Sequence, residues 1–197
     1  MLSKSITVIS IIIGVALVSI VFASYINDSY LLTNEKPISE IWLLGPERTA
    51  EYYPYNITSN QDYTVYLGVN NRLNEDAEYS IRLKLCDNTQ QLPDSATAEF
   101  SPLSSIEEFD FSLSDEETWE TRLDFALNYD LIQQNLTRIE NIEINGVTFS
   151  INQNLILDSD QDLFNVILVF ELWNKNATAS TFEYTNQYLQ LILKLDG

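Results

Sequence analysis

The sequence predicts a mainly β protein, an immunoglobulin-like β-sandwich preceded by one N-terminal transmembrane helix. Three observations predict this class. One apolar run near the start is long enough to cross a bilayer, alternating apolar and polar residues recur through the rest of the chain, and turn-forming residues separate these stretches at intervals of roughly 8 to 12 residues. Hydrophobic residues make up 45% of the chain and aromatic residues 12%, which is enough for a packed core.

The first predicted element is a membrane helix within residues 1–27. No charged residue lies between Ser5 and Asn27, and the run from Ile6 to Phe22 is dominated by Ile and Val. Its length suits a helix that spans the hydrocarbon core of a bilayer, which takes roughly 20 apolar residues. Lys4 precedes the run and Asp28 follows it, so the positive-inside tendency places the N-terminus in the cytoplasm. We therefore expect a single-pass protein of the cell membrane whose C-terminal domain is extracytoplasmic.

Two other interpretations of this segment stay open. The first is a signal peptide cleaved after Val21-Phe22-Ala23, although the apolar run exceeds the roughly 7–15 residues of a typical signal core. The second is the helix of an archaeal type IV pilin, which would make the chain a filament subunit. However, no Gly or Ala follows Lys4 at the expected processing point. All three interpretations export the same domain.

After a predicted stalk at residues 28–37, residues 38–197 are predicted to form the exported β-sandwich. Apolar residues at alternate positions predict half-buried strands, because successive side chains of a strand point to opposite faces. These alternating positions are Ile41 and Leu43; Tyr63, Val65, Leu67 and Val69; Tyr79, Ile81, Leu83 and Leu85; Phe109, Phe111 and Leu113; and Thr121, Leu123, Phe125 and Leu127.

Four later segments complete the predicted domain. Asn145-Gly146 lies between alternating apolar runs and predicts a two-residue hairpin turn, because both turn positions take positive φ. The continuous apolar runs Val166–Trp173 and Tyr188–Leu195 predict central strands. The stretch Tyr129–Gln134 is the candidate for a short helix outside the membrane segment.

The composition excludes several classes of function. The chain has 10 Lys and Arg residues against 29 Asp and Glu residues, a formal net charge of -19, and a chain this acidic repels the phosphate backbone of nucleic acids. It contains no His, which excludes Ser-His-Asp and Cys-His catalysis and His-based metal sites built from this chain. The single cysteine, Cys86, cannot form an internal disulfide and is expected to be buried. We expect no cofactor and no nucleic-acid partner.

Short motifs follow one another in the exported part: a Gly-Pro strand end, a Tyr-Pro-x-Asn-x-Thr turn, a Gly-x-x-Asn strand end and an acidic turn before Trp-Glu. They are formed by Gly45, Pro46, Tyr53, Pro54, Asn56, Thr58, Gly68, Asn71, Trp119 and Glu120. With the last two strands, they resemble an archaeal family known as domain of unknown function 1616, over residues 40–127 and 164–195. Residues 128–163 are predicted to be an insertion. The resemblance implies an exported, adhesion-type sandwich without assigned catalytic residues.

Four Asn-x-Ser/Thr sequons stand in the exported part, and none has Pro at its middle position. Such motifs are acceptors of N-linked glycans on surface loops of exported proteins. The predicted glycosylation sites are Asn27, Asn56, Asn135 and Asn176.

Alternating carboxylates at Asp158, Asp160 and Asp162 resemble the spacing that short calcium-binding loops use. An EF-hand would place Gly and Glu where this chain has Leu163 and Val169. The loop is therefore predicted to be a solvated turn before a strand, with calcium binding as the alternative and no metal site assigned.

Other residues with chemical potential receive structural interpretations. Paired carboxylates at Glu75-Asp76, Glu107-Glu108 and Asp115-Glu116-Glu117 have the composition that glycoside hydrolysis uses, but turns of acidic exported proteins carry such pairs routinely. The three tryptophans are predicted to be core residues, and the aromatic stretch Tyr52–Tyr55 is a candidate docking edge in a loop. The tryptophans are Trp42, Trp119 and Trp173.

These observations together predict a non-enzymatic, membrane-tethered β-sandwich that mediates protein-protein or cell-envelope interaction. Its expected partners are the membrane, through the N-terminal helix, and a protein of the envelope or membrane. The alternatives are a pilin-like filament subunit and an exported carbohydrate hydrolase that works through carboxylates.

Overall fold

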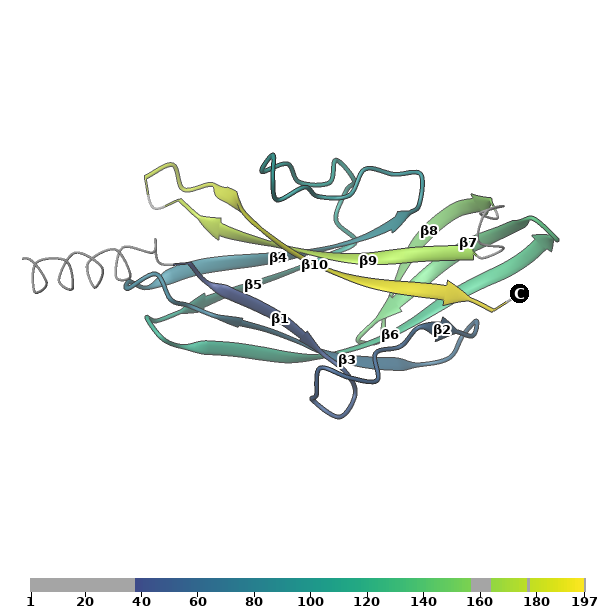
Figure 1. The fold of residues 1–197 in the computed structure, drawn as a ribbon, viewed down its shortest axis with the longest axis horizontal. Helices are drawn as coiled ribbons and strands as arrows, with labels where there is room; N and C mark the ends of the chain where they lie inside the picture. The colour runs from purple at the N-terminus through teal and green to yellow at the C-terminus, as the bar shows by residue number, and fades with distance from the viewer. Residues whose placement is uncertain (1–37, 157–163, 177, 197) are drawn as a thin grey trace, which may run out of the picture. The chain divides into compact units, whose positions relative to one another are not determined.

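The computed structural model describes residues 38–156, 164–176 and 178–196, and within these residues the chain is mainly β and contains no helix (Figure 1). The predicted anchor and stalk lie outside the described residues. Among the described residues, no helix has the length and apolarity to span a bilayer. The strands are β1 (Glu40–Leu44), β2 (Asn56–Ile57), β3 (Tyr63–Asn70), β4 (Ala77–Asp87), β5 (Glu107–Leu113), β6 (Thr118–Gln133), β7 (Leu136–Ile144), β8 (Val147–Ile156), β9 (Phe164–Lys175) and β10 (Phe182–Leu195).

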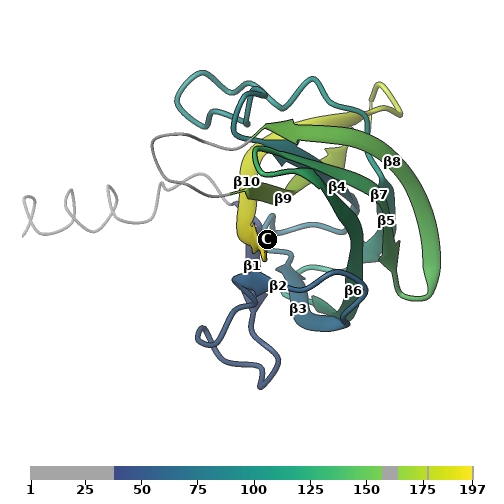
Figure 2. The ribbon, with the colours of Figure 1, turned by 90° about the vertical axis from the view of Figure 1, so that its right-hand side faces the viewer.

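The strands form two five-stranded sheets that face each other (Figure 2). Sheet A has the order β1-β3-β6-β7-β8, and sheet B has the order β2-β10-β9-β4-β5. Neighbouring strands are antiparallel except β2, which pairs in parallel with the end of β10. The predicted central strand Val166–Trp173 is confirmed, because it lies in β9, between β10 and β4. The second predicted central strand, Tyr188–Leu195, lies in β10, which pairs with β9 on one side and with β2 only at Lys194 and Leu195 on the other.

The core lies between the sheets and consists of alternate residues of each strand. β4 contributes Tyr79, Ile81, Leu83 and Leu85, and the facing strand β3 contributes Val65, Leu67 and Val69. Burying such side chains removes roughly 25 cal/mol of unfavourable hydration per Å² of apolar surface, which makes this layer the main source of stability. The alternation predicted from the sequence is therefore confirmed.

The predicted hairpin turn is also present, between β7 and β8. Asn145 has φ 50° and Gly146 has φ 81°, and Ile144 pairs with Val147 across the turn. The side chain of Asn145 also accepts a hydrogen bond from the backbone N–H of Asp124 at 2.9 Å, which attaches the turn to β6. The Asn-Gly sequence forms this turn because both residues tolerate positive φ.

The predicted helix at Tyr129–Gln134 is wrong, because β6 continues through Gln133. Tyr129 is buried, and its hydroxyl donates a hydrogen bond to the carbonyl of Ile57 and also lies 3.1 Å from the carbonyl of Asp196. The pairing of β6 with β7 shifts register between Asn128 and Tyr129 and again between Leu131 and Gln133. Apolar residues therefore do not alternate regularly in this part of the strand. The segment is therefore the far end of a long, irregular strand.

The outer face of β4 and β9 in sheet B is buried as well, beneath the segment 88–106 that connects β4 to β5 (Figures 1 and 2). Cys86, Val169 and Trp173 are buried on this face but lie outside the cluster between the sheets. The ring of Phe100, from the covering segment, lies 4.9 Å from the ring of Trp173 in an edge-on arrangement. Sheet B therefore separates two apolar layers, and the predicted burial of Cys86 is confirmed.

Candidate interaction surface

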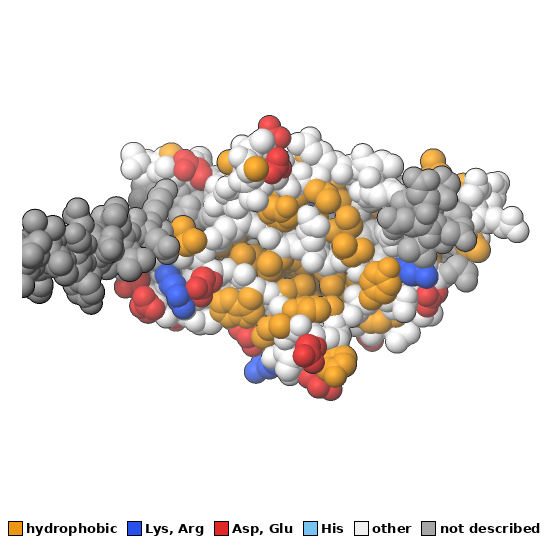
Figure 3. All heavy atoms as spheres, in the orientation of Figure 1, with side chains coloured by type: hydrophobic (Ala, Val, Ile, Leu, Met, Phe, Trp, Pro, Cys, Tyr) orange, Lys and Arg blue, Asp and Glu red, His pale blue; other side chains and the backbone are white. Residues whose placement is uncertain are grey.

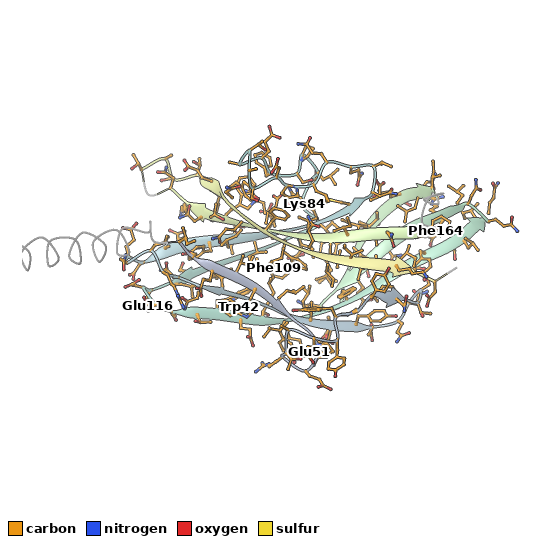
Figure 4. The ribbon with its side chains drawn as sticks, in the orientation of Figure 1. Trp42, Glu51, Lys84, Phe109, Glu116 and Phe164 are labelled. Atoms are coloured by element: carbon orange, nitrogen blue, oxygen red, sulfur yellow. The ribbon has the colours of Figure 1, made fainter. Side chains whose placement is uncertain are left out.

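The loop that connects β1 to β2 carries the two most exposed aromatic side chains of the part of the chain that the structure describes. We call residues 45–55 the tyrosine loop. Tyr52 keeps 71% of its surface exposed, Tyr55 keeps 48%, and Tyr53 is also exposed. The loop stands out from the edge of sheet A (Figure 3), and Glu51 is labelled on it in Figure 4.

A tight turn fixes the base of the tyrosine loop. The backbone N–H of Gly45 donates to the carbonyl of Thr49 at 2.7 Å, and the N–H of Arg48 donates back to the carbonyl of Gly45 at 3.0 Å. A Cβ atom at residue 45 would lie 2.0 Å from the carbonyl oxygen of Glu51, so only glycine fits. The hydroxyl of Tyr53 donates to the carbonyl of Leu43 at 2.8 Å and attaches the loop to β1.

Arg48 attaches the loop to the outer face of sheet A. Its guanidinium carbon lies 4.6 Å from the ring centroid of Tyr66 in β3, and its Nε lies 3.6 Å from Oε1 of Glu120 in β6. At the far end of the loop, the N–H of Lys194 donates to the carbonyl of Tyr55 at 2.6 Å. The tyrosine loop is therefore held to both sheets while its aromatic side chains face solvent.

Apolar surface continues from the tyrosine loop onto sheet B. Ile192, which precedes the Lys194 contact by two residues in β10, is also exposed. Figure 3 shows hydrophobic side chains across the face between β1 and β10, above the loop. At the start of β1, a groove of about 700 Å³ is lined by residues 38–41 and 186–190. This side of the domain therefore carries exposed apolar surface, although the chain as a whole is strongly acidic.

Asn71, which belongs to the Gly-x-x-Asn motif, has a structural role. Asn71 is fully buried, and its amide nitrogen donates to the carbonyls of Glu75 at 2.7 Å, Ser114 at 3.1 Å and Leu113 at 3.2 Å. Its side-chain oxygen accepts a hydrogen bond from the hydroxyl of Tyr79 at 2.8 Å. One asparagine thereby holds two loops at the same end of the domain.

The three tryptophans occupy different environments. Trp119 packs against the core and stacks on Phe111, with ring centroids 4.2 Å apart, as predicted. Trp173 is buried in the outer layer of sheet B, beneath the segment 88–106. Trp42 is only half-buried and covers Gly68, where a Cβ atom would lie 2.2 Å from the indole Cε2. The predicted core position is therefore confirmed for Trp119 and Trp173, the latter in the second apolar layer, and is wrong for Trp42.

The structure brings some of the acidic residues together. Glu75, Asp76 and Glu117 line one groove of about 770 Å³ together with Lys175. Glu107 and Glu108 lie elsewhere, on β5, where Glu108 lies 3.4 Å from Arg82. The described residues contain no group of His, Cys, Asp and Glu side chains arranged to hold a metal ion. The alternating Asp158–Asp162 carboxylates lie outside the described residues.

The sequons also differ in environment. Asn56 and Asn135 are exposed, Asn135 in the turn between β6 and β7. The amide nitrogen of Asn176 donates to Oε1 of Glu183 at 2.8 Å, and its carbonyl oxygen accepts from the N–H of Thr178 at 2.9 Å. Asn27 lies outside the described residues, and glycosylation at all four positions stays a prediction.

A buried polar site that the sequence patterns did not indicate lies on the outer face of sheet B. Lys84 and Glu171 form an ion pair there, and the N–H of Ser101 donates to Oε1 of Glu171 at 2.7 Å. The amine of Lys84 donates to the carbonyl of Ser101 at 2.6 Å. A charged residue inside each of two apolar strands, Leu83-Lys84-Leu85 and Phe170-Glu171-Leu172, was the signal that could have revealed the pair.

The fold defines a mainly β domain of two packed sheets, with an exposed aromatic loop at the edge of one sheet. The chain belongs to the family described as Domain of unknown function (DUF1616), whose model matches residues 33–152. This confirms the family resemblance. The match includes residues 128–152, so the boundaries of the proposed insertion stay a prediction.

Two further comparisons give little about function. No protein of curated function matches the chain. A solved structure of the complex between zinc 2-glycoprotein and prolactin inducible protein from human seminal plasma is 12% identical, covers 83% of this chain and 96% of that chain, and has a TM-score of 0.35. At that similarity the match carries no inference about this chain.

Proposed function

We propose that this protein is a membrane-tethered, extracytoplasmic module that binds another protein of the cell envelope or membrane through its tyrosine loop and performs no catalysis. The exposed tyrosines of an anchored loop are the observation that carries this proposal. Tyrosine is enriched at protein interfaces because it offers a large apolar ring and a polar hydroxyl. The attachment of the loop through Gly45, Arg48 and Tyr53 reduces the ordering cost of binding, which favours a contact role.

The proposal includes an immunoglobulin-like arrangement of the strands. In that fold, strands A, B and E share one sheet and strands C, F and G share the other. The pairing of β1, β3 and β6 in sheet A and of β4, β9 and β10 in sheet B follows the same scheme. β7 lies beside β6, in the place that strand D takes beside E, although it follows β6 in the chain. The late hairpin is therefore an addition to the shared scheme.

The membrane tether is proposed from the apolar run Ile6–Phe22 and the charges that flank it. A tethered domain meets its partner within the envelope, where local concentration is high, so a small contact surface is sufficient. Protease added to intact cells should remove the domain. Protection of the domain until the cells are lysed would show that it faces the cytoplasm and would contradict the proposal.

Site-specific photo-crosslinking tests the binding role of the tyrosine loop in the full-length chain in its own cells. A photoreactive residue at Tyr52 should form an adduct with one protein of the envelope or membrane. The matched control is Val147, which is exposed at the β7–β8 turn. Yield at Tyr52 that is no higher than at Val147 would contradict the proposal.

Substitutions at the loop complete this test. Tyr52→Ala together with Tyr55→Ala should lower capture of the crosslinked protein by about tenfold or more, because aromatic truncation at an interface centre costs roughly 2 kcal/mol. Val147→Ala should leave it unchanged. An adduct that contains only a second copy of this chain would identify a filament subunit instead.

A further inference from the structure

The turn between β6 and β7 combines a sequon with exposed aliphatic side chains. Asn135 is exposed in this two-residue turn, and the next residue, Leu136, begins β7. Leu131 and Ile132, near the end of β6, each keep about half of their surface exposed. Ile156, which pairs with Leu136, keeps 73% exposed. Leu131 shares a sheet face with its partner Thr137, whereas Ile156 lies on the opposite face with Leu136. Exposed aliphatic side chains therefore flank the Asn135 turn on both faces of this end of sheet A.

We propose that Asn135 carries an N-linked glycan and that this glycan shields the aliphatic end of sheet A. Clustered aliphatic side chains on a soluble surface mark either a contact or a covered site. An attached glycan is bulky and strongly hydrated, so it covers neighbouring apolar surface without requiring a second protein. The glycan bond forms between the Nδ2 atom of Asn135 and the anomeric carbon of a sugar, which leaves its activated phosphate donor, while Nδ2 loses one proton.

The environment of the Asn135 amide suits this modification. Among the described residues, its side chain makes no hydrogen bond or ion pair, and the turn projects beyond the last paired residues of β6 and β7. A sugar attached to Nδ2 therefore replaces only water. No native contact has to break.

Asn176 offers the opposite environment within the same chain. Its Nδ2 atom already donates to Glu183, and its Oδ1 atom accepts hydrogen bonds from the N–H groups of Thr178 and Ala179. The backbone of Asn176 also pairs with Thr181, closing the loop between β9 and β10. A sugar on this amide would displace the Glu183 contact, so the structure assigns the side chain of Asn176 to shaping the loop.

The third residue of the Asn135 sequon fixes the order of events. Thr137 is only 1% exposed and faces inward in β7, opposite Leu155. Because the acceptor motif requires this hydroxyl-bearing residue, the folded hairpin hides part of what the transferase recognises. Glycan transfer to Asn135 therefore precedes the pairing of β7 with β6 and β8.

Mass spectrometry of the full-length protein from the cells that produce it tests the modification itself. The peptide that contains Asn135 should carry a glycan mass in most molecules, and the peptide that contains Asn176 should be unmodified. An unmodified Asn135 peptide would overturn the proposal. A glycan on Asn176 in folded protein would overturn the argument from amide contacts.

Sequon variants test the shielding role. Asn135→Gln and Thr137→Val each remove the acceptor motif, and valine fits the buried space of threonine. The matched control is Gln134→Ala, which changes the neighbouring turn residue and leaves the sequon intact. Sedimentation should show self-association about tenfold stronger for the first two variants than for wild type or control. Equal self-association in all four proteins would show that the glycan shields nothing.

A further variant identifies the surface through which the unglycosylated protein self-associates. Adding Leu131→Ser, Ile132→Ser and Ile156→Ser to Asn135→Gln should restore the wild-type sedimentation profile. Persistent association would place the contact elsewhere and overturn the shielding role.

Acceptor assays test the order of events. Membranes from the same cells should modify a peptide of residues 130–140 but not the folded, unmodified chain. Equal modification of both would overturn the order proposed here. These outcomes are independent of the tyrosine loop.

Discussion

The amine of Lys84 lies 2.8 Å from Oε2 of Glu171, and both side chains are almost inaccessible to water, at 3% and 0% exposure. The pair lies between sheet B and the segment 88–106, where Ser101 contacts both partners. The indole N–H of Trp173 also donates to Oε2 of Glu171 at 3.2 Å. Two desolvated charges thus fasten an otherwise irregular segment to the sheet.

Breaking this pair should destabilise the domain strongly. Lys84→Met leaves the carboxylate of Glu171 buried without its cation, and the free energy of unfolding should fall by about 3 kcal/mol or more. Urea denaturation of the purified full-length chain measures this change. The matched control is Lys194→Met at a half-buried lysine without a charged partner among the described residues, and it should change stability by less than about 0.5 kcal/mol. Equal losses for the two variants would contradict a special role for the pair.

Gly68→Ala should lower stability through Trp42. The new methyl group would lie 2.2 Å from the indole, so the ring must leave its place on β3. Overpacking of this kind costs roughly 1–3 kcal/mol. Thermal denaturation should show a lower Tm for Gly68→Ala, and Trp42→Leu should remove most of the additional loss in the double variant. Additive losses would mean that the indole does not limit residue 68.

The stability cost of substitutions at Gly146 should depend on how well the new residue adopts positive φ, and not on contacts of its side chain. Nothing lies within 4 Å of the position that a Cβ atom would take at Gly146, while its φ is 81°. Gly146→Val should therefore cost roughly 1 kcal/mol or more through backbone strain, and Gly146→Asn should cost less because asparagine accepts positive φ. Chemical denaturation midpoints measure both. A valine variant as stable as wild type would argue against strain in this turn.

Stability should decline at alkaline pH. Burial raises the pKa of the Tyr79, Tyr129 and Tyr184 phenols and of the Cys86 thiol above their ordinary values of 10.0 and 9.0. The unfolded chain therefore loses these protons first, so their contribution is complete below about pH 9 and decreases as the pH rises through 9 to 10 and beyond. Urea midpoints from pH 7 to 11 should fall accordingly. In Tyr79→Phe the decline above pH 9 should be shallower, and an unchanged slope would exclude that phenol as a contributor.

Salt should stabilise the protein through its net charge of -19. Self-repulsion is screened when ionic strength rises from about 0.01 M to 0.15 M, so the Tm should increase. In that salt, a calcium chelator should leave the Tm unchanged in wild type and in Asp160→Ala. A chelator effect of several degrees that Asp160→Ala abolishes would instead establish calcium binding at Asp158–Asp162.

The strands were predictable because burial of one sheet face imposes a period of two on the sequence. That period holds in β3, β4 and β5 and in β6 as far as Leu127, and the Asn-Gly turn adds a local signal of its own. It fails after Leu127, where adjacent Leu131 and Ile132 accompany register shifts in β6. This end of β6 is an irregular strand that pairs only with β7, across the following turn, and its register shifts remove the regular alternation that would have identified it as a strand.

The outer layer of sheet B was not predictable from periodicity. Segment 88–106 covers the second face of β4 and β9, and no local pattern states where a connecting segment will fold back. The same reason explains Trp173, which is buried beneath that segment. The tyrosine loop was identified from composition, because four consecutive residues with three tyrosines have no strand period, but its attachment through Arg48 to Tyr66 and Glu120 depends on β3 and β6.

β1 gives the molecule a defined path for mechanical load. It begins two residues after Ile38, where the described chain starts, and it ends at Leu44, directly before the tyrosine loop. If the chain is anchored before β1 and bound to a partner at the tyrosine loop, tension enters and leaves at the two ends of this one strand. The covalent backbone of β1 then carries the load, and its five residue pairs with β3 lie beside the path of the force. A partner could therefore be held under tension without the two sheets having to separate.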